Sequence, residues 1–361
     1  HLRFPGFTGE WEVKKLGDVC EIKTGKKDTK NKEDDGEYPF FVRSNTVERI
    51  NSYSYDGEAI LTSGDGVGVG KNFHYINGKF DFHQRVYSLR KFKNGYIGKY
   101  IYYLFSDRFY DRVTRLSAKN SVDSVRMDMI SGMQVYFPLS TEQTKISSFL
   151  SLIDERIQTQ IKIIEELKLL KNTLGKKIFS RQLRFKDDNG NDFPEWQHKK
   201  LGELATITTG SSNREDSILD GEYTFFDRSQ DVRTSKRYLF NKEAVIVPGE
   251  GQKFTPKYFM GKFDLHQRTY AIFDFIELSG KYLYYHIDID EKYLQSQAVG
   301  STVKSLRLPM FQSMPIKFPP LEEQMKIANF LSSIDTKIDV ETELLEKLEE
   351  QKKYLLQNLF I

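Results

Sequence analysis

The chain has 361 residues, of which 54 are Lys or Arg and 51 are Asp or Glu, giving a formal charge of +3. Apolar residues make up 39% of it, and since no apolar run approaches the length of a membrane-spanning helix, we expect no membrane partner. Cys20 is the only cysteine, which excludes internal disulfides and thiolate-cluster metal sites; with no apolar secretion signal at the start, a cytoplasmic protein is expected.

Short runs rich in aromatic and β-branched residues fill the first part of the chain and predict strands. The runs are 19–25, 39–44, 58–63, 72–76 and 85–90. The segment 96–113 has a helical pattern, and a Pro-containing stretch then leads into a long charged helix from about Ser140 to Ser180. Ser140 and Gln143 have the spacing of a capping box at the start of this helix.

The same order of elements returns about 180 residues later. The clearest copies are Leu16–Gly25 with Leu201–Gly210, Asp35–Phe41 with Asp220–Phe226, Gly78–Tyr87 with Gly261–Tyr270, and Trp11 with Trp196. Such a period is too long for a solenoid, so it indicates two whole modules of one design. We therefore predict an α+β fold in four parts: β-rich modules at 1–139 and 183–320, each followed by a long helix, at 140–182 and 321–361.

Both long helices carry an aliphatic seam at alternating spacings of four and three residues, as in a coiled coil. The seam positions are Ile153, Ile157, Gln160, Ile164, Leu167, Lys171, Leu174 and Ile178, and their copies Ile334, Ile338, Glu341, Leu345, Leu348, Lys352, Leu355 and Leu359. Two seams of matched length favour pairing of the helices with each other over an amphipathic helix lying on its own module.

The polar seam positions predict an antiparallel pair. A parallel pair would set Lys171 against Lys352, whereas an antiparallel pair sets Lys171 against Glu341 and Gln160 against Lys352, so that buried charges keep partners. The seam is about 38 Å long at 1.5 Å per residue. The modules are then expected at opposite ends of the helix pair, related by a pseudo-twofold axis, at a spacing of about one turn of B-DNA.

Several segments resemble the specificity subunit of Type I restriction–modification systems. They are WEVKKLGDVCEIKTG at 11–25, EWQHKKLGELATITTG at 195–210, and two longer runs at 120–154 and 300–335, each containing the pattern P…EQ…I…FL…ID at the entry to a long helix. Nearly the whole chain takes part. Lys119, Asn120 and Ser121 stand where the second copy has Gly300, Ser301 and Thr302, a small departure.

The resemblance implies two target recognition domains, each of which reads one half of a bipartite site in double-stranded DNA, with the helices as a ruler between them. It also implies partners: two methylation subunits, which bind S-adenosylmethionine and modify adenine, and motor–nuclease subunits, which use ATP and Mg²⁺. The chain itself is expected to bind no cofactor.

Motifs for chemistry within this chain are weak. The loop Ser63–Lys71 lacks the spacing of a phosphate loop, and no His or Cys spacing supports a metal site. We therefore expect a non-catalytic, DNA-binding subunit. Two alternatives stay open: a stand-alone DNA nuclease or methyltransferase, and a symmetric protein–protein scaffold without nucleic acid.

Comparison of the two copies sorts the candidate DNA-binding residues. If the modules read different half-sites, shared residues are framework or phosphate contacts and differing surface residues are base readers. The shared candidates are Arg43, Ser44, His83, Gln84 and Arg85, with their copies Arg228, Ser229, His266, Gln267 and Arg268. For the HQR sequence at 83–85 and 266–268, a structural role is favoured first, a DNA-backbone contact second and catalysis last.

The differing segments hold the remaining candidates. They are 26–34 against 211–219, 45–56 against 230–241, 65–77 against 250–260, and 106–120 against 288–301. Asn45 and Gln230 are amides able to bind adenine N6 and N7, or else ordinary surface amides. The cations Lys26, Lys27, Lys71, Lys253 and Arg214 are expected to neutralise phosphate or to lie on solvated loops.

Overall fold

The computed structural model describes residues 2–66, 68–117 and 124–360. By its contacts the chain divides into two compact units. Unit 1 is His1–Ile161 with Glu343–Ile361, and unit 2 is Lys162–Thr342. Each unit contains one β-rich module and a part of each long helix, so the units differ from the four consecutive parts drawn along the sequence.

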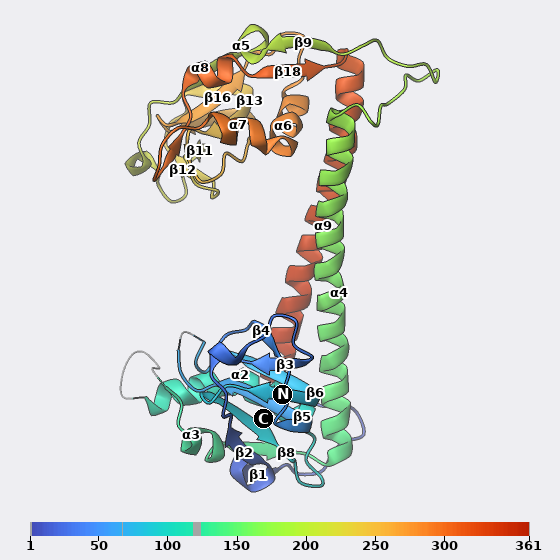
Figure 1. The fold of residues 1–361 in the computed structure, drawn as a ribbon, viewed down its shortest axis with the longest axis vertical. Coiled ribbons are helices and arrows are strands. Elements are labelled where there is room, and N and C mark those ends of the chain that lie inside the picture. The colour runs from blue at the N-terminus through green and yellow to red at the C-terminus, as the bar shows by residue number, and fades with distance from the viewer. Residues whose placement is uncertain (1, 67, 118–123, 361) are drawn as a thin grey trace. The chain divides into compact units, whose positions relative to one another are not determined.

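A six-stranded sheet forms the centre of the first module, in the order β2-β7-β5-β6-β3-β4 (Figure 1). Adjacent strands in this sheet are antiparallel except β3 and β6, which run parallel. A second sheet pairs β1 with β8. The strands are β1 (Glu12–Lys15), β2 (Glu21–Thr24), β3 (Tyr38–Phe41), β4 (Val47–Ile50), β5 (Tyr55–Ser63), β6 (Phe73–Phe82), β7 (Val86–Arg90) and β8 (Gln134–Phe137); the helices are α1 (Leu16–Val19), η1 (Thr29–Asn31), α2 (Gly98–Leu116) and α3 (Met127–Ser131).

The second module repeats this order as β10-β16-β13-β15-β11-β12, again with one parallel pair, β11 and β15. The duplication and the α+β fold predicted from the sequence are therefore confirmed. The strands are β9 (Gln197–Lys200), β10 (Thr206–Thr209), β11 (Tyr223–Phe226), β12 (Arg233–Ser235), β13 (Phe240–Pro248), β14 (Glu250–Gly251), β15 (Lys257–Leu265), β16 (Thr269–Phe273), β17 (Lys304–Ser305) and β18 (Pro315–Phe318); the helices are α5 (Leu201–Leu204), η2 (Arg214–Asp216), α6 (Gly280–Ile289), α7 (Glu291–Gln297) and α8 (Leu308–Gln312).

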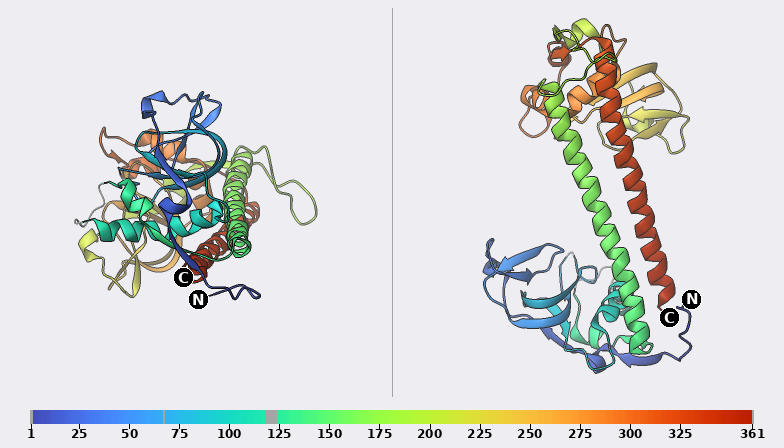
Figure 2. Two further views of the ribbon diagram at one scale, coloured as in Figure 1. Left: turned by 90° about the horizontal axis from the view of Figure 1, so that it is seen from below. Right: turned by 90° about the vertical axis from the view of Figure 1, so that its right-hand side faces the viewer.

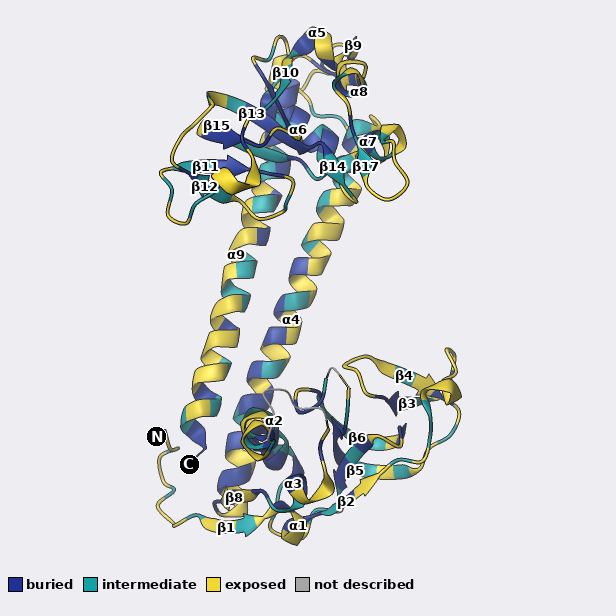
Figure 3. Cartoon of the chain, turned by 90° about the vertical axis from the view of Figure 1, so that its left-hand side faces the viewer, coloured by how far each residue is buried: buried dark blue, intermediate teal, exposed yellow. Residues whose placement is uncertain are grey.

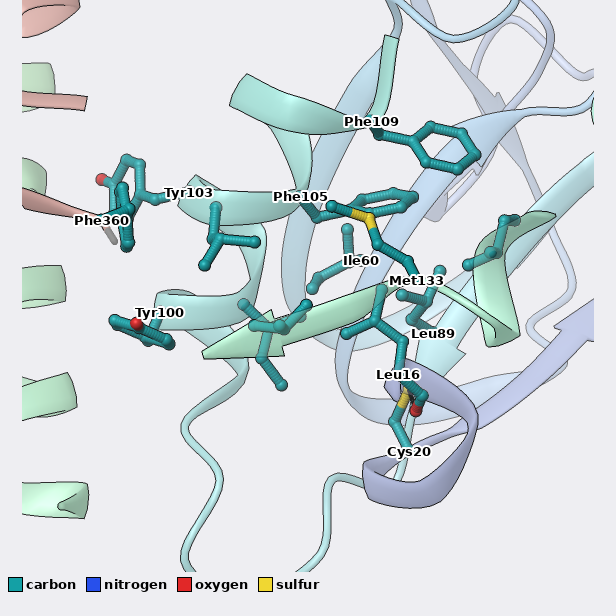
Figure 4. Packing of buried hydrophobic residues seen from close by; sticks show 14 of the residues in the cluster. Leu16, Cys20, Ile60, Leu89, Tyr100, Tyr103, Phe105, Phe109, Met133 and Phe360 are labelled. Atoms are coloured by element: carbon teal, nitrogen blue, oxygen red, sulfur yellow. Dashed lines mark hydrogen bonds between the residues drawn. The ribbon is translucent and has the colours of Figure 1, made fainter. Parts of the chain in front are cut away.

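The core of unit 1 lies between the sheet and α2. Tyr100, Phe105 and Phe109 of α2 are fully buried there, beside Ile60 and Leu89 of the sheet (Figure 4). Phe360, which follows the end of the second long helix, is also fully buried, with its ring 5.3 Å from that of Tyr100. The end of this helix is thereby anchored in the core of the first module.

The two long helices, α4 (Ser140–Phe179) and α9 (Leu321–Leu359), lie side by side and run in opposite directions (Figures 1 and 2). In unit 1 Asp154 binds Lys352, and in unit 2 Lys171 binds Asp335, so the partner number falls as the residue number rises. Every predicted seam position is buried or half-buried. Figure 3 shows buried and intermediate bands alternating with exposed ones along both helices. The antiparallel coiled coil is confirmed. Within the described part of the chain, no helix combines the length and apolarity needed to cross a membrane.

The ion pairs along the seam are not the predicted ones. Lys171 binds Asp335 at 2.9 Å and Asp288 at 3.1 Å in place of Glu341, and Lys352 binds Asp154 at 2.6 Å in place of Gln160. The prediction considered only contacts between one seam position and another. A lysine side chain, however, is long enough to reach a carboxylate that flanks the opposite seam. Glu341 binds Lys337 on its own helix.

Asp154 and Asp335 each also fix a helix of the adjoining module. Tyr103 of α2 donates to Asp154 at 2.8 Å, and Tyr285 of α6 donates to Asp335 at 2.7 Å. One carboxylate therefore joins three elements in each unit: the module helix, α4 and α9. We call these two groups the Tyr–Asp–Lys networks.

The substitution Tyr285→Phe is expected to lower the free energy of unfolding by about 1.5–3 kcal/mol, because a hydrogen bond to a charged group is lost while the ring stays packed. Tyr284→Phe is the matched control, since among the described residues its hydroxyl has no hydrogen-bond partner, and we expect a change below about 0.5 kcal/mol. Denaturant unfolding of the full chain measures both. Equal losses in the two variants would contradict a role for the Asp335 contact.

The glutamine of each EQ pair joins the helix start to the module, which differs from the predicted capping box. Gln143 accepts from the backbone N–H of Ile97 and donates to the carbonyl groups of Gly95 and Pro138. Gln324 makes the equivalent three bonds in unit 2, to Ser279, Glu277 and Pro319. The repeated motif therefore orients the long helix on its module.

Candidate nucleic-acid interface

The HQR turns connect β6 to β7 and β15 to β16, and close backbone packing fixes their shape. Gly25 and Gly210 lie against the strand that enters each turn: a Cβ at Gly25 would be 1.9 Å from the carbonyl oxygen of Phe82, and one at Gly210 would be 1.7 Å from that of Leu265. Only glycine allows this approach.

The histidines of the HQR turns are buried and hold the backbone of the turn. His83 and His266 are 3% and 6% exposed, and the Nδ1 of each accepts the backbone N–H of the arginine two residues on, at 2.9 and 3.0 Å. Burial and the nearby Arg43 guanidinium lower the pKa of His83; burial and Arg228 do the same for His266. A neutral ring that accepts a backbone hydrogen bond supports the structural role placed first for this residue.

The arginines of the turns point outward and share a carboxylate with a second arginine. In the first module Asp65 binds Arg43 at 3.2 Å and Arg85 at 3.8 Å. In the second, Glu250 binds Arg228 and Arg268, each at 2.5 Å. The arginine side chains are between 45% and 68% exposed. Each module thus presents two oriented guanidinium groups, which we call the arginine pair.

The hydrogen bonds of Glu250 make its charge dependent on these arginines. Burial alone would raise the pKa of Glu250, but hydrogen bonds from Arg268 and Arg228 outweigh it and hold that pKa below its usual value. The carboxylate therefore stays ionised at neutral pH, and its contribution to stability is lost only as the pH falls through this lowered pKa.

The structure adds a third arginine that sequence reasoning missed. A cleft of about 450 Å³ beside the first HQR turn is lined by Asp65, Arg85 and Arg126. Arg307 is the copy of Arg126 and follows Leu306, whose N–H bonds to the carbonyl of Gly249, next to Glu250. Both arginines stand in the repeated segments 121–126 and 302–307, so their recurrence was the available signal.

Other predicted residues lie near the HQR turn and the arginine pair of each module, a region that we call the corner. The Lys27 carbonyl accepts the N–H of Gln84, and the Gln84 amide reaches Asp28 at 3.3 Å. Ser44 and Asn45 follow Arg43 on one exposed loop, and Ser229 and Gln230 follow Arg228 in the same way. Both candidate amides therefore lie exposed on a loop, two residues after one arginine of the pair.

The remaining candidate cations lie in different surroundings. Lys71 lies over the ring of Tyr110 at 4.7 Å, and Arg214 lies 4.0 Å from Asp227 and is 67% exposed. Lys26 and Lys253 are exposed. Some predicted positions lie outside the described residues. They are Val67 in the loop Ser63–Lys71, residues 118–120 of the segment 106–120, and the triplet Lys119, Asn120 and Ser121 that differs between the copies.

A redox or metal centre has no support at this corner. Among residues 2–66, 68–117 and 124–360, no group of three His, Cys, Asp or Glu side chains could hold a metal ion. Cys20 is buried in the core, which raises its pKa to about 12. The exposed chemistry of the corner is cationic and amide, which suits a polyanion with hydrogen-bonding edges.

Two modules of one design, each with outward arginines on a shared framework, define a duplicated binding protein. The model of the Type I restriction modification DNA specificity domain matches residues 8–169 and again residues 194–350. The chain therefore belongs to the family of Type I restriction–modification specificity proteins.

Individual relatives agree with this assignment. The chain is 29% identical over 154 residues to the EcoDI specificity subunit of Escherichia coli, a match that covers 43% of this chain and only 34% of that protein. It is 24% identical over 375 residues to the putative MjaX specificity subunit of Methanocaldococcus jannaschii, covering 96% of this chain and 83% of the relative.

The fold is also that of a solved relative. The crystal structure of a Type I restriction–modification S subunit from M. genitalium superposes with a TM-score of 0.69 at 17% identity, covering 99% of this chain and 97% of that one. At this identity the comparison establishes the fold alone.

The exchange Arg85→Ala or Arg268→Ala is expected to weaken DNA binding to all sequences alike. Each removes one expected phosphate contact, so the slope of log K against log salt should become shallower by about 0.9, because one fewer counterion is released. Binding of the full chain to one duplex at several salt concentrations measures this slope. Lys93→Ala, an exposed lysine beyond the other end of β7, is the control and should leave the slope unchanged.

Proposed function

We propose that this chain is the non-catalytic specificity subunit of a Type I restriction–modification complex and recognises a bipartite site in double-stranded DNA. Each module reads one half of the site. One observation carries the proposal: both modules hold an arginine pair on the same framework, whereas the segments around it differ in sequence. Shared cations suit the phosphate backbone, and differing loops suit different bases.

The long helices are the element that links the two modules. Both α4 and α9 are continuous, and the Tyr–Asp–Lys networks and the Gln143 and Gln324 contacts join them to the modules at several points. In this proposal the paired helices act as the ruler that sets the number of unread base pairs between the half-sites.

The reactions belong to partner subunits. Two methylation subunits would bring S-adenosylmethionine and modify adenine, and motor–nuclease subunits would use ATP and Mg²⁺, all in the cytoplasm. This chain would direct them to the target and would itself hold no cofactor. The exposed faces of α4 and α9 are available for such partners.

A selection experiment tests the proposal. Purified chain is mixed with duplexes of random sequence, bound DNA is recovered and sequenced, and labelled S-adenosylmethionine is added with and without the methylation subunits. We expect two short sequence blocks separated by unread positions, and methyl transfer only when the methylation subunits are present. A single contiguous block, or methyl transfer or cleavage by the chain alone, would contradict the proposal.

A further inference from the structure

Both modules contain a buried aspartate two residues before the histidine of the HQR turn, and the hydrogen-bond partners of this aspartate differ between the modules. Asp81 at the end of β6 is 2% exposed, and Asp264 at the end of β15 is 0% exposed. In the first module Asp81 accepts hydrogen bonds from the hydroxyl groups of Ser52 and Ser54 at 2.9 and 2.8 Å. The side chains that bind the Asp81 carboxylate are therefore small and neutral.

In the second module an arginine replaces one of these serines. Asp264 accepts from the hydroxyl groups of Ser212 and Ser235 at 2.5 and 2.9 Å, and the Nε of Arg237 lies 3.7 Å from it. Strand register makes Arg237 the counterpart of Ser52. Two residues further on, Ser54 donates its N–H to the carbonyl of Phe80, and Leu239 donates to that of Phe263, the copy of Phe80.

The guanidinium of Arg237 is held on one edge and open on the other. Its Nη2 donates to the Ser212 hydroxyl at 2.8 Å and lies 3.6 Å from Asp216, while the side chain stays 54% exposed. Among the described residues none accepts a hydrogen bond from its Nη1. Because the Ser212 carbonyl accepts the N–H of Gln267, this guanidinium lies beside the second HQR turn.

We propose that Arg237 reads a guanine in the half-site bound by the second module. The inference rests on the proposed function and adds a base to it. An arginine fork on guanine O6 and N7 is the commonest base-specific contact in the major groove, and prior orientation by Asp264 and Ser212 reduces the side-chain entropy lost on binding. Ser52 is too short to make this contact, so the guanine is expected in the second half-site and not at the matching position of the first.

The test compares base preferences of the wild-type chain, Arg237→Ser and Arg237→Lys. Duplexes are selected from a pool randomised at every position, and the preference at each position is measured together with the salt slope. The wild type is expected to require guanine at one position of the second half-site. Arg237→Ser, which installs the residue of the first module, should reduce that preference at least about tenfold and leave the first half-site unchanged.

Two of the variants separate base reading from charge. Arg237→Lys keeps the charge but loses the planar fork; it should bind non-target DNA like the wild type while discriminating less at the guanine position. Lys236→Ser removes the neighbouring exposed cation and should leave every base preference unchanged.

The outcomes are distinct. If the wild type selects no split site, the proposed function fails and this inference fails with it. If it selects a split site but both Arg237 variants keep the guanine preference, or no guanine occurs in the second half-site, only the inference is overturned. Equal weakening for all sequences with a shallower salt slope would overturn it too, since Arg237 would then contact phosphate.

Discussion

The substitution Gly210→Ala is expected to lower the free energy of unfolding of the second module by about 3 kcal/mol or more. The new Cβ would lie 1.7 Å from the carbonyl oxygen of Leu265, where real Cβ contacts are essentially never closer than 3.0 Å. The neighbouring atom belongs to the backbone at the end of β15, so it cannot move aside without disturbing the parallel contact between Ser212 and His266. Denaturant unfolding of the full chain measures the loss.

Gly9→Ala is the matched control, because a Cβ at Gly9 would meet nothing within 4 Å. It should change stability by less than about 0.5 kcal/mol. Gly210→Ala should also remove discrimination at the second half-site while the first half-site is still read, since Gly25 and its turn are untouched. If the two variants unfold alike, the close approach at Gly210 does not determine the turn.

Exchange of the differing segments is expected to change which DNA sequence is recognised. Residues 26–34 and 45–56 are replaced by 211–219 and 230–241, which have equal lengths and include the change from Ser52 to Arg237. The first half-site should then take on the sequence of the second. A mismatch costs about 1–3 kcal/mol per base pair, so several changed positions should weaken binding of the original target about 100-fold or more.

The measurement for this exchange is sequencing of methylated DNA from cells that contain the partner subunits with either version of the chain. The second half-site acts as an internal control, because its module is unaltered. Two unchanged half-sites would mean that the base-reading residues lie outside the exchanged segments.

Much of the fold could be predicted from the sequence because the chain repeats itself. A strand or helix pattern that occurs twice is less ambiguous than one that occurs once, and the polar positions Lys171 and Lys352 correctly indicated antiparallel helices. The partners of these lysines could not be predicted, because Asp154 and Asp335 flank the seam and Asp288 comes from α6. The spacing of the seam positions does not predict contacts with residues outside the seam.

The candidate site was predicted less completely, for a physical reason. The repeat identified Arg85 and Arg268, but the carboxylates that orient them, Asp65 and Glu250, lie about 20 residues away in the sequence and differ in type. The role of Arg237 depends on the burial of Asp264, which only the packing of the sheet determines. Sequence comparison sorted shared from differing positions, and the structure shows which of them meet.

We propose that two modules, joined by paired helices, read two separated parts of one DNA duplex. The most direct test measures affinity for the selected target while the number of base pairs between its two half-sites is changed one at a time. We expect a sharp optimum at one spacer length, with binding reduced about tenfold or more by a change of a few base pairs, because each base pair also rotates one half-site about the helix axis. Affinity that stays the same across spacer lengths would contradict it.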